Sequence, residues 1–158
     1  MRKLFIFLAL CAILGLLTAS TYTINVPGTI DWATFTVGDH TSTGNEITVS
    51  TVSSMTMCGI TVENIRTNAK GYLTLGGSDD ADLKLTDPLM VKGGDLGNLD
   101  VNYVPLTSDR ILRASTTAIA SANISDFAVS QTIASGDLTK TAGTYSLIMT
   151  FTATFSGP

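Results

Sequence analysis

A long alternation of apolar and hydroxyl-bearing residues near the C-terminus constrains this chain more than any other feature. The odd positions from Tyr145 to Phe155 carry Tyr, Leu, Met, Phe, Ala and Phe, and the even positions carry Ser, Ile and three Thr. Such a period of two is typical of a β-strand that buries one face. At about 3.3 Å per residue the segment would span about 35 Å, which is long for a globular strand. The pattern predicts one long C-terminal strand, which pairs either within its own subunit or with a neighbour.

The N-terminus has the pattern of a secretory signal peptide. Two basic residues precede a nearly continuous apolar run at 4–17, and small residues follow at 18–20. The apolar run is too short for a comfortable membrane span. We therefore expect residues 1–19 to be removed, and residues 20–158 to form a single secreted domain with no membrane span.

The composition of the mature chain narrows the choice of partners. Removing residues 1–19 leaves seven basic and thirteen acidic residues, a formal charge of −6. This acidic balance argues against nucleic acid and anionic membranes as partners. Serine and threonine are abundant while charged residues are few, which suits an all-β extracellular domain because threonine is a good strand residue.

Short strand-like segments recur along the mature chain, separated by turns rich in Gly, Asp and Asn. This spacing predicts an all-β fold, an antiparallel β-sandwich that ends in the long C-terminal strand. The polar stretch 38–45 is expected to be a turn, and residues 109–123 either a helical turn or a loop with a short strand. The expected strands cover residues 30–37, 47–52, 60–62, 71–75, 83–85, 89–91, 99–103, 127–133 and 145–155.

The residue types needed for catalysis are scarce. His40 is the only histidine, so any Ser–His or Cys–His machinery would depend on it. It lies in the polar stretch expected to be a turn, where a structural or solvent-exposed role is the usual one. The acidic residues gather in turns rather than on strands that could face a cleft. We therefore expect no enzymatic activity and no cofactor.

One acidic loop is the best place to look for a metal ion. Asp79, Asp80 and Asp82 lie close together in the segment GGSDDAD, and calcium takes several oxygen ligands from such loops. The EF-hand spacing is missing, and no glutamate follows at the distance that motif requires. A solvated loop without metal is therefore the favoured interpretation, with calcium as the alternative.

Two further residues allow covalent modification. Cys58 is the only cysteine after residue 19, so it is either a buried small apolar residue, a partner in an intermolecular disulfide, or a free thiol. Asn123 begins the sequence Asn-Ile-Ser, an N-glycosylation acceptor in a secreted chain whose host glycosylates. Neither residue identifies a function by itself.

Three aromatic residues leave a binding role open. Trp32, Tyr72 and Tyr103 would offer a sugar-binding platform if the fold brought them together, although strand aromatics more often pack in a core. The loops around 76–82 and 92–98 are the natural positions for a binding surface in that case.

The closing segment GTYSLIMTFTAT (143–154) resembles the final strand of small secreted immunoglobulin-like sandwiches from archaeal and bacterial surfaces. The composition is similar to that of subunits of prokaryotic sheaths and donor-strand pili, the tubular sheaths of methanogens in particular. The resemblance implies an immunoglobulin-like fold and a structural role at the cell surface.

These observations favour a secreted structural protein that assembles with copies of itself into a filament, sheath or surface layer. The terminal strand lacks charge and proline, which ordinary soluble proteins use to protect sheet edges. Cell-surface glycans are additional expected partners. The alternative is a monomeric secreted module for carbohydrate binding or adhesion. The residues expected at the subunit interface are Tyr145, Leu147, Met149, Phe151 and Phe155, with Cys58 as a cross-link.

Overall fold

A computed structural model describes residues 22–32, 34–51, 56–94, 102–114 and 121–156. Within these ranges no helix is long and apolar enough to cross a membrane. The strands are β1 (Tyr22–Asn25), β2 (Gly38–Thr51), β3 (Thr56–Glu63), β4 (Thr74–Leu75), β5 (Met90–Lys92), β6 (Val104–Pro105), β7 (Arg110–Ala114), β8 (Ser121–Ile133), β9 (Tyr145–Ser146) and β10 (Thr150–Ser156). Two 3₁₀ helices, η1 (Ala81–Leu83) and η2 (Ser135–Thr139), complete the elements.

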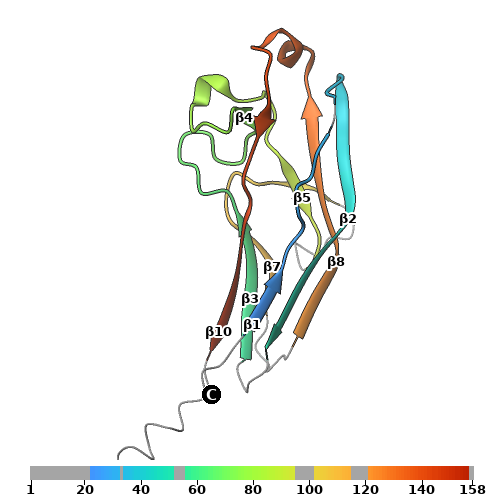
Figure 1. Cartoon of the computed structure of the whole chain (residues 1–158), viewed down its shortest axis with the longest axis vertical. Coiled ribbons are helices and arrows are strands. Elements are labelled where there is room, and N and C mark those ends of the chain that lie inside the picture. Colours follow the sequence, from blue (N-terminus) through green and yellow to red (C-terminus); the bar gives the residue numbers. More distant parts are fainter. Residues whose placement is uncertain (1–21, 33, 52–55, 95–101, 115–120, 157–158) are drawn as a thin grey trace, which may run out of the picture.

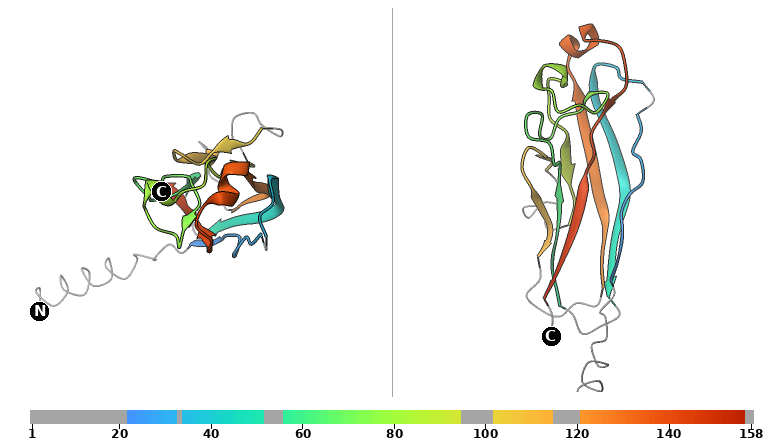
Figure 2. Two further views of the ribbon diagram at one scale, coloured as in Figure 1. Left: turned by 90° about the horizontal axis from the view of Figure 1, so that it is seen from above. Right: turned by 60° about the vertical axis from the view of Figure 1, so that its left-hand side comes forward.

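The strands form antiparallel sheets, which confirms the predicted all-β class. The larger sheet has the order β1-β2-β8-β5-β6, the second has the order β10-β3-β7, and β4 pairs with β9. The two larger sheets face each other along an elongated body, with β10 and β3 on one side and β2 and β8 on the other (Figure 1). Both 3₁₀ helices lie at one end of this body, and β10 ends at the opposite end (Figure 2).

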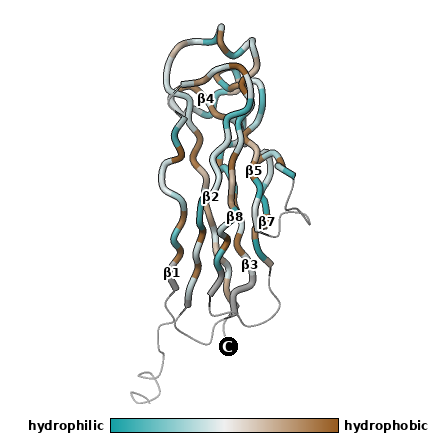
Figure 3. The backbone as a smooth tube through the Cα atoms, turned by 90° about the vertical axis from the view of Figure 1, so that its right-hand side faces the viewer, coloured by the Kyte–Doolittle hydropathy of each residue, from teal (hydrophilic) through white to brown (hydrophobic). Residues whose placement is uncertain are grey.

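The space between the sheets is filled by apolar side chains from both of them. Apolar and polar residues alternate along β10, much of β3 and the second half of β2, so that one face of each of these segments turns inward (Figure 3). Phe127 of β8 meets Phe151 of β10 edge to face at a ring-centroid distance of 5.4 Å, which joins the two sheets directly. The buried cluster consists of Ile47, Val49, Ile60, Val62, Leu73, Leu85, Leu89, Val91, Leu106, Leu112, Ile124, Phe127, Val129 and Ile133.

The prediction of a turn at 38–45 was wrong. These residues form the first half of β2 and pair with β8, where Asn45 lies opposite Phe127. The register shifts on both sides of Asn45, whose side-chain amide donates to the backbone oxygen and the hydroxyl of Ser42, both at 3.3 Å. The stretch has no apolar alternation, and its pairing partner lies about ninety residues away in the sequence. A local pattern therefore did not reveal this strand.

The prediction of a strand at 30–37 was also wrong. Residues 30–32 and 34–37 belong to no strand. Ile30, Trp32 and Phe35 instead pack, partly buried, against the core cluster. Their apolar character comes from this packing rather than from membership of a sheet.

The long C-terminal strand is divided in two. Tyr145–Ser146 pairs with β4 and Thr150–Ser156 pairs with β3, while residues 147–149 belong to neither strand. The alternation nevertheless continues through the break, because the apolar odd-numbered side chains all pack against the core of the same subunit. The pattern correctly indicated the buried face, and it did not reveal the change of pairing partner.

The remaining expected strands are confirmed in part. Strands at 47–51, 60–62 and 127–133 lie within β2, β3 and β8, and the short strand allowed for in 109–123 is β7. Two strands were expected at 71–75 and 83–85, and only Thr74–Leu75 (β4) forms one. Lys84 pairs with Thr74 through an isolated antiparallel β-bridge. Residues 99–101 lie outside the described ranges.

Candidate functional site: an open sheet edge and an adjoining groove

Strand β10 is the outer strand of the three-stranded sheet. It pairs with β3 on one side, from Thr150 opposite Glu63 to Ser156 opposite Thr56, and no described strand pairs with its other side. Phe151 and Phe155 point toward the core, while Thr152 and Thr154 are exposed on the outer face. All seven residues of β10 lack charge, and proline is missing from the strand. An edge of this kind is a ready partner for another strand.

The other edges of the two larger sheets are better protected. Strand β6 has two residues, one of them Pro105, which has no backbone N–H to donate. Strand β7 carries Arg110 and Arg113, and the Arg110 guanidinium donates to the Pro105 carbonyl at 2.9 and 2.7 Å. This contact bridges the two sheets on the β6–β7 side.

The remaining edge, on the far side of β2, is protected in a different way. Strand β1 covers the end of β2 with only four residues. The uncovered half of β2 carries Asp39, His40 and Glu46 and contains the two register shifts near Asn45. Charges and bulges are the devices that natural sheets use against edge-to-edge pairing. Strand β10 is therefore the least protected edge among the described strands.

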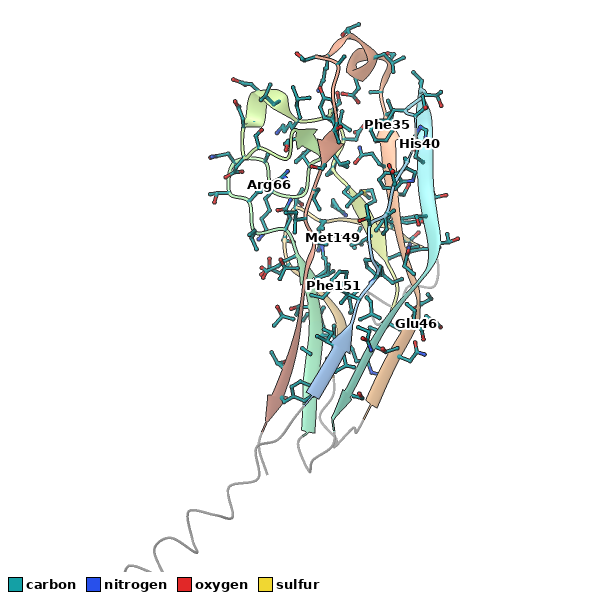
Figure 4. The ribbon with its side chains drawn as sticks, in the orientation of Figure 1. Phe35, His40, Glu46, Arg66, Met149 and Phe151 are labelled. Carbon is teal, nitrogen blue, oxygen red and sulfur yellow. The ribbon has the colours of Figure 1, made fainter. Side chains whose placement is uncertain are left out.

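A groove opens between the sheets on the β10 side. Its volume is about 700 Å³, and its walls are residues 26–32, 34 and 35 on one side and residues 143–149 and 151 on the other. Leu73, Leu89 and Val129 line its floor. Figure 4 shows Met149 and Phe151 on the C-terminal segment where it faces the segment that carries Phe35. Two rim residues are exposed large apolar side chains, Val26 at 45% and Ile148 at 68%. This groove adjoins β10, because Phe151 of β10 lines it and Met149 lies just before the strand.

His40 supports one wall of the groove. Its ring meets that of Phe35 edge to face at 5.5 Å, and its Nε2 lies 2.8 Å from the Thr36 carbonyl and 3.3 Å from the Thr36 N–H. Nε2 forms one of these two hydrogen bonds at a time. It donates to the Thr36 carbonyl when it carries a hydrogen, and it accepts from the Thr36 N–H when it does not. This geometry gives His40 a structural role in anchoring the 34–37 segment to β2.

Arg66 holds the other wall. Its guanidinium Nη1 donates to the Thr74 hydroxyl at 2.7 Å, to the Ser146 carbonyl at 3.2 Å and to the Tyr72 carbonyl at 3.3 Å. Burial lowers the pKa of Arg66 from its ordinary value, and the nearby Asp79 carboxylate acts in the opposite direction. The side chain thereby ties the loop after β3 to both β4 and β9 (Figure 4).

The aspartates considered for calcium binding stabilise loops. Asp79 accepts hydrogen bonds from three consecutive backbone N–H groups, those of residues 67–69, at 2.9–3.1 Å. The bond from Ala69 is the main reason that the pKa of Asp79 lies below its ordinary value. Asp80 accepts from the N–H of Asp82 at 2.9 Å and so begins η1. Within the described ranges no three His, Cys, Asp or Glu side chains are placed to hold a metal ion.

The five residues expected at a subunit interface lie on the groove wall and on β10. Tyr145, Leu147, Met149, Phe151 and Phe155 pack, partly buried, against the core of their own subunit. Their side chains thus contribute to the fold, and the free backbone edge of β10 is what remains available to a partner. Sequence reasoning missed Ile148 and Val26, although an isoleucine among the threonines of the outward-facing positions was a visible irregularity.

The modification sites lie on two different strands. Cys58 lies in a β-bulge of β3, because Thr154 is opposite Gly59 and Phe155 is opposite Met57. Its side chain lies outside the described residues, so the disulfide stays a prediction. Asn123 is exposed on β8, and its side-chain amide donates to the Glu46 carboxylate at 2.6 Å.

The three aromatic residues do not line one surface. Trp32 lines the groove next to Phe35, with ring centroids 6.3 Å apart. Lys84 covers the Tyr72 ring at 4.3 Å, and Lys92 covers the Tyr103 ring at 4.9 Å. The shared platform considered from the sequence is therefore not formed by these residues.

Comparison with known proteins adds no relative. No protein-family model, curated protein or solved structure matches this chain. The chain is an all-β protein with antiparallel sheets, and among its described strands β10 is the least protected edge and lies beside an apolar groove. The immunoglobulin-like relationship and the resemblance to sheath and pilus subunits stay predictions.

Proposed function

We propose that this chain is a secreted structural protein that assembles with copies of itself into a cell-surface filament, sheath or layer by β-strand pairing. The observation that carries the proposal is the uncharged, proline-free edge of β10. In a protein that works as a monomer such an edge is an aggregation hazard, whereas in a subunit of a polymer it supplies the contact. The N-terminal signal pattern, which lies outside the described residues, supports secretion.

The apolar groove beside this edge adds surface that a second copy can cover. Its apolar floor and the exposed Val26 and Ile148 side chains lie on the same side of the molecule as the free edge of β10. Apolar area that a partner covers adds about 25 cal/mol per Å² to the hydrogen bonds that a paired strand forms. We therefore place the contact between copies at the β10 edge and the adjoining groove.

Positive charge on the β10 edge is expected to abolish assembly. In the mature protein, Thr152→Lys together with Thr154→Lys adds two charges to the exposed face of β10 without removing a core side chain. Because the charges of two approaching copies repel and must be desolvated, we expect no polymers by negative-stain microscopy and monomers by light scattering. The urea midpoint for unfolding should change little, since exposed substitutions usually alter stability by about 0.5 kcal/mol or less.

The matched control carries the same charge change on another strand. Thr41→Lys with Thr43→Lys places two lysines on exposed positions of β2, in its uncovered half. We expect this variant to assemble like the parent protein. Loss of assembly in the β2 variant with retention in the β10 variant would show that the wrong edge had been chosen, and a parent protein that stays monomeric at high concentration would contradict self-assembly altogether.

A monomeric binding or adhesion module is the second candidate, and the groove is the observation that favours it. A volume of about 700 Å³ lies within the range of small-molecule sites. Trp32 is the only tryptophan of the chain and lines the groove, so its fluorescence reports on occupancy.

Titration of Trp32 fluorescence separates the two functions. If self-assembly is the function, cell-surface oligosaccharides added to the monomeric β10 lysine variant should leave the emission unchanged. A saturable change of emission that is lost after Ile148→Asp, in a protein that never polymerises, would instead establish the binding module.

A further inference from the structure

The identity of the strand that pairs with β10 follows from the edges that a second copy can offer. Strand β6 contains Pro105, β7 carries two arginines and contacts β6 through Arg110, and β1 offers four residues. The uncovered half of β2 carries charges and register shifts. Among the edge strands that the structure describes, only β10 combines seven residues with no charge and no proline.

Building on the proposed function, we infer that the partner of β10 is the β10 strand of a second copy, and that the two strands run antiparallel about a twofold axis. Because one side of β10 has no partner among the described strands, this pairing closes after two copies and is isologous, with the same surface used by both. The building unit of the assembly is therefore a symmetric dimer. The closed pair leaves neither β10 edge free, so growth into a filament or layer requires a second contact in addition to this one.

The two faces of β10 select the antiparallel arrangement. Two identical edges can meet antiparallel about an axis perpendicular to the sheet, or parallel about an axis along the strands. The first arrangement keeps both apolar faces on the same side, so that Phe151, Ala153 and Phe155 of one copy extend the inward face of the other. The second places this apolar face beside the partner's exposed Thr152 and Thr154, so that the partly buried Phe151 and Phe155 gain no apolar neighbour from the second copy.

The antiparallel arrangement also sets a register. If all seven residues pair, the twofold axis passes Ala153, and Thr152 of each copy lies opposite Thr154 of the other. On the inward face Phe151 lies opposite the second copy's Phe155. Threonine–threonine and aromatic pairs directly opposite each other are favourable in antiparallel sheets, at about 0.2–1 kcal/mol each. The three-stranded sheet then becomes a six-stranded one, which is an ordinary size.

Cysteine cross-linking of the mature protein tests this pairing. In a Cys58→Ser background that assembles like the parent, Thr152→Cys and Thr154→Cys are made separately and are oxidised alone and after mixing. Residues directly opposite have Cα atoms about 4.5–5.5 Å apart, within the range of about 4.4–6.8 Å found in disulfides, whereas diagonal neighbours are about 7–8 Å apart and lie beyond it. We expect a strong disulfide-linked dimer in the mixture and at least fivefold less in either variant alone.

Each other outcome overturns the inference in a distinguishable way. Strong cross-linking of each variant alone, with little in the mixture, would indicate parallel in-register pairing. Polymers that form without either cross-link would show that another segment covers β10, which leaves self-assembly standing and removes the twofold pairing. A protein that is monomeric at all concentrations and forms no cross-link would remove both the inference and the proposed function.

Discussion

Replacing Phe127 with alanine is expected to lower the free energy of unfolding by about 3–5 kcal/mol, the usual cost of deleting a buried aromatic ring. Phe127 is fully buried on β8, and its ring meets that of Phe151 on β10. The variant loses both the transfer free energy of the ring and the contact that joins the two sheets. Urea unfolding of the monomeric β10 lysine variant, with and without Phe127→Ala, measures the difference in midpoint at a similar m-value.

An exposed residue of similar chemistry provides the control. Ile111 of β7 is 57% exposed, so Ile111→Ala should change the free energy of unfolding by about 0.5 kcal/mol or less. Phe127→Ala should also weaken assembly, because β10 loses the aromatic contact that seats it on the opposite sheet. A loss below about 1 kcal/mol at Phe127 would show that the two sheets are not packed as described.

Replacing Asp137 with asparagine is expected to cost about 1–3 kcal/mol at neutral pH, the range for leaving buried polar groups without partners. The carboxylate is only 2% exposed and lies 3.0 Å from the Lys140 ammonium. It accepts hydrogen bonds from the Thr86 N–H at 2.9 Å, the Thr86 hydroxyl at 2.7 Å and the Ala134 N–H at 3.0 Å. An asparagine amide turns an N–H toward at least one of these donors, so the η2 turn and the loop before β5 lose their common anchor.

The effect of Asp137 depends on pH in a definite direction. Burial by itself would raise the pKa of Asp137, but the hydrogen bonds from Thr86, Lys140 and Ala134 outweigh it, so the pKa lies below the ordinary value of about 3.9. The unfolded state therefore takes up the proton first as the solution is acidified. The stabilisation is complete above the unfolded pKa and is lost as the pH falls through the folded pKa.

Parallel unfolding curves between pH 7 and pH 2 measure this dependence. The difference in unfolding free energy between the parent and Asp137→Asn should be constant from pH 7 to about pH 5 and shrink below about pH 4. As a comparison, Thr86→Val removes the hydroxyl donor and keeps the Thr86 backbone donor, so it should show a smaller loss and retain most of the acid dependence. A parent–variant difference that does not change with pH would contradict the role of the charge.

Some strands could be predicted from the local sequence, because burying one face of a strand requires apolar residues at alternate positions. The alternation at 127–133 and at 60–62 correctly predicted inward-facing strands, since side chains two residues apart share one face. The same reasoning identified the apolar odd-numbered positions of the C-terminal segment. Pattern failed at 38–45, which has no apolar face, and at 30–37, whose aromatic residues line a groove instead of a sheet.

The candidate site was likewise predictable from the sequence only in part. The lack of charge and proline in Thr150–Ser156 was visible as a sequence property. The importance of this property depends on which strands lie at sheet edges, and the order β10-β3-β7 shows that one side of β10 has no partner within the described ranges. The groove likewise could not be foreseen, because its walls come from segments more than a hundred residues apart.

The sequence by itself determined that this chain is an all-β protein and that the C-terminal segment buries its odd-numbered side chains. Those properties follow from the period of the backbone and the transfer of apolar side chains out of water, both of which act locally. Only the tertiary structure decided that the segment divides at 147–149, that β10 pairs with β3 of its own subunit, and that no other described strand pairs with it. Strand pairing joins backbone groups distant in sequence, so the choice of partner depends on the whole arrangement of sheets.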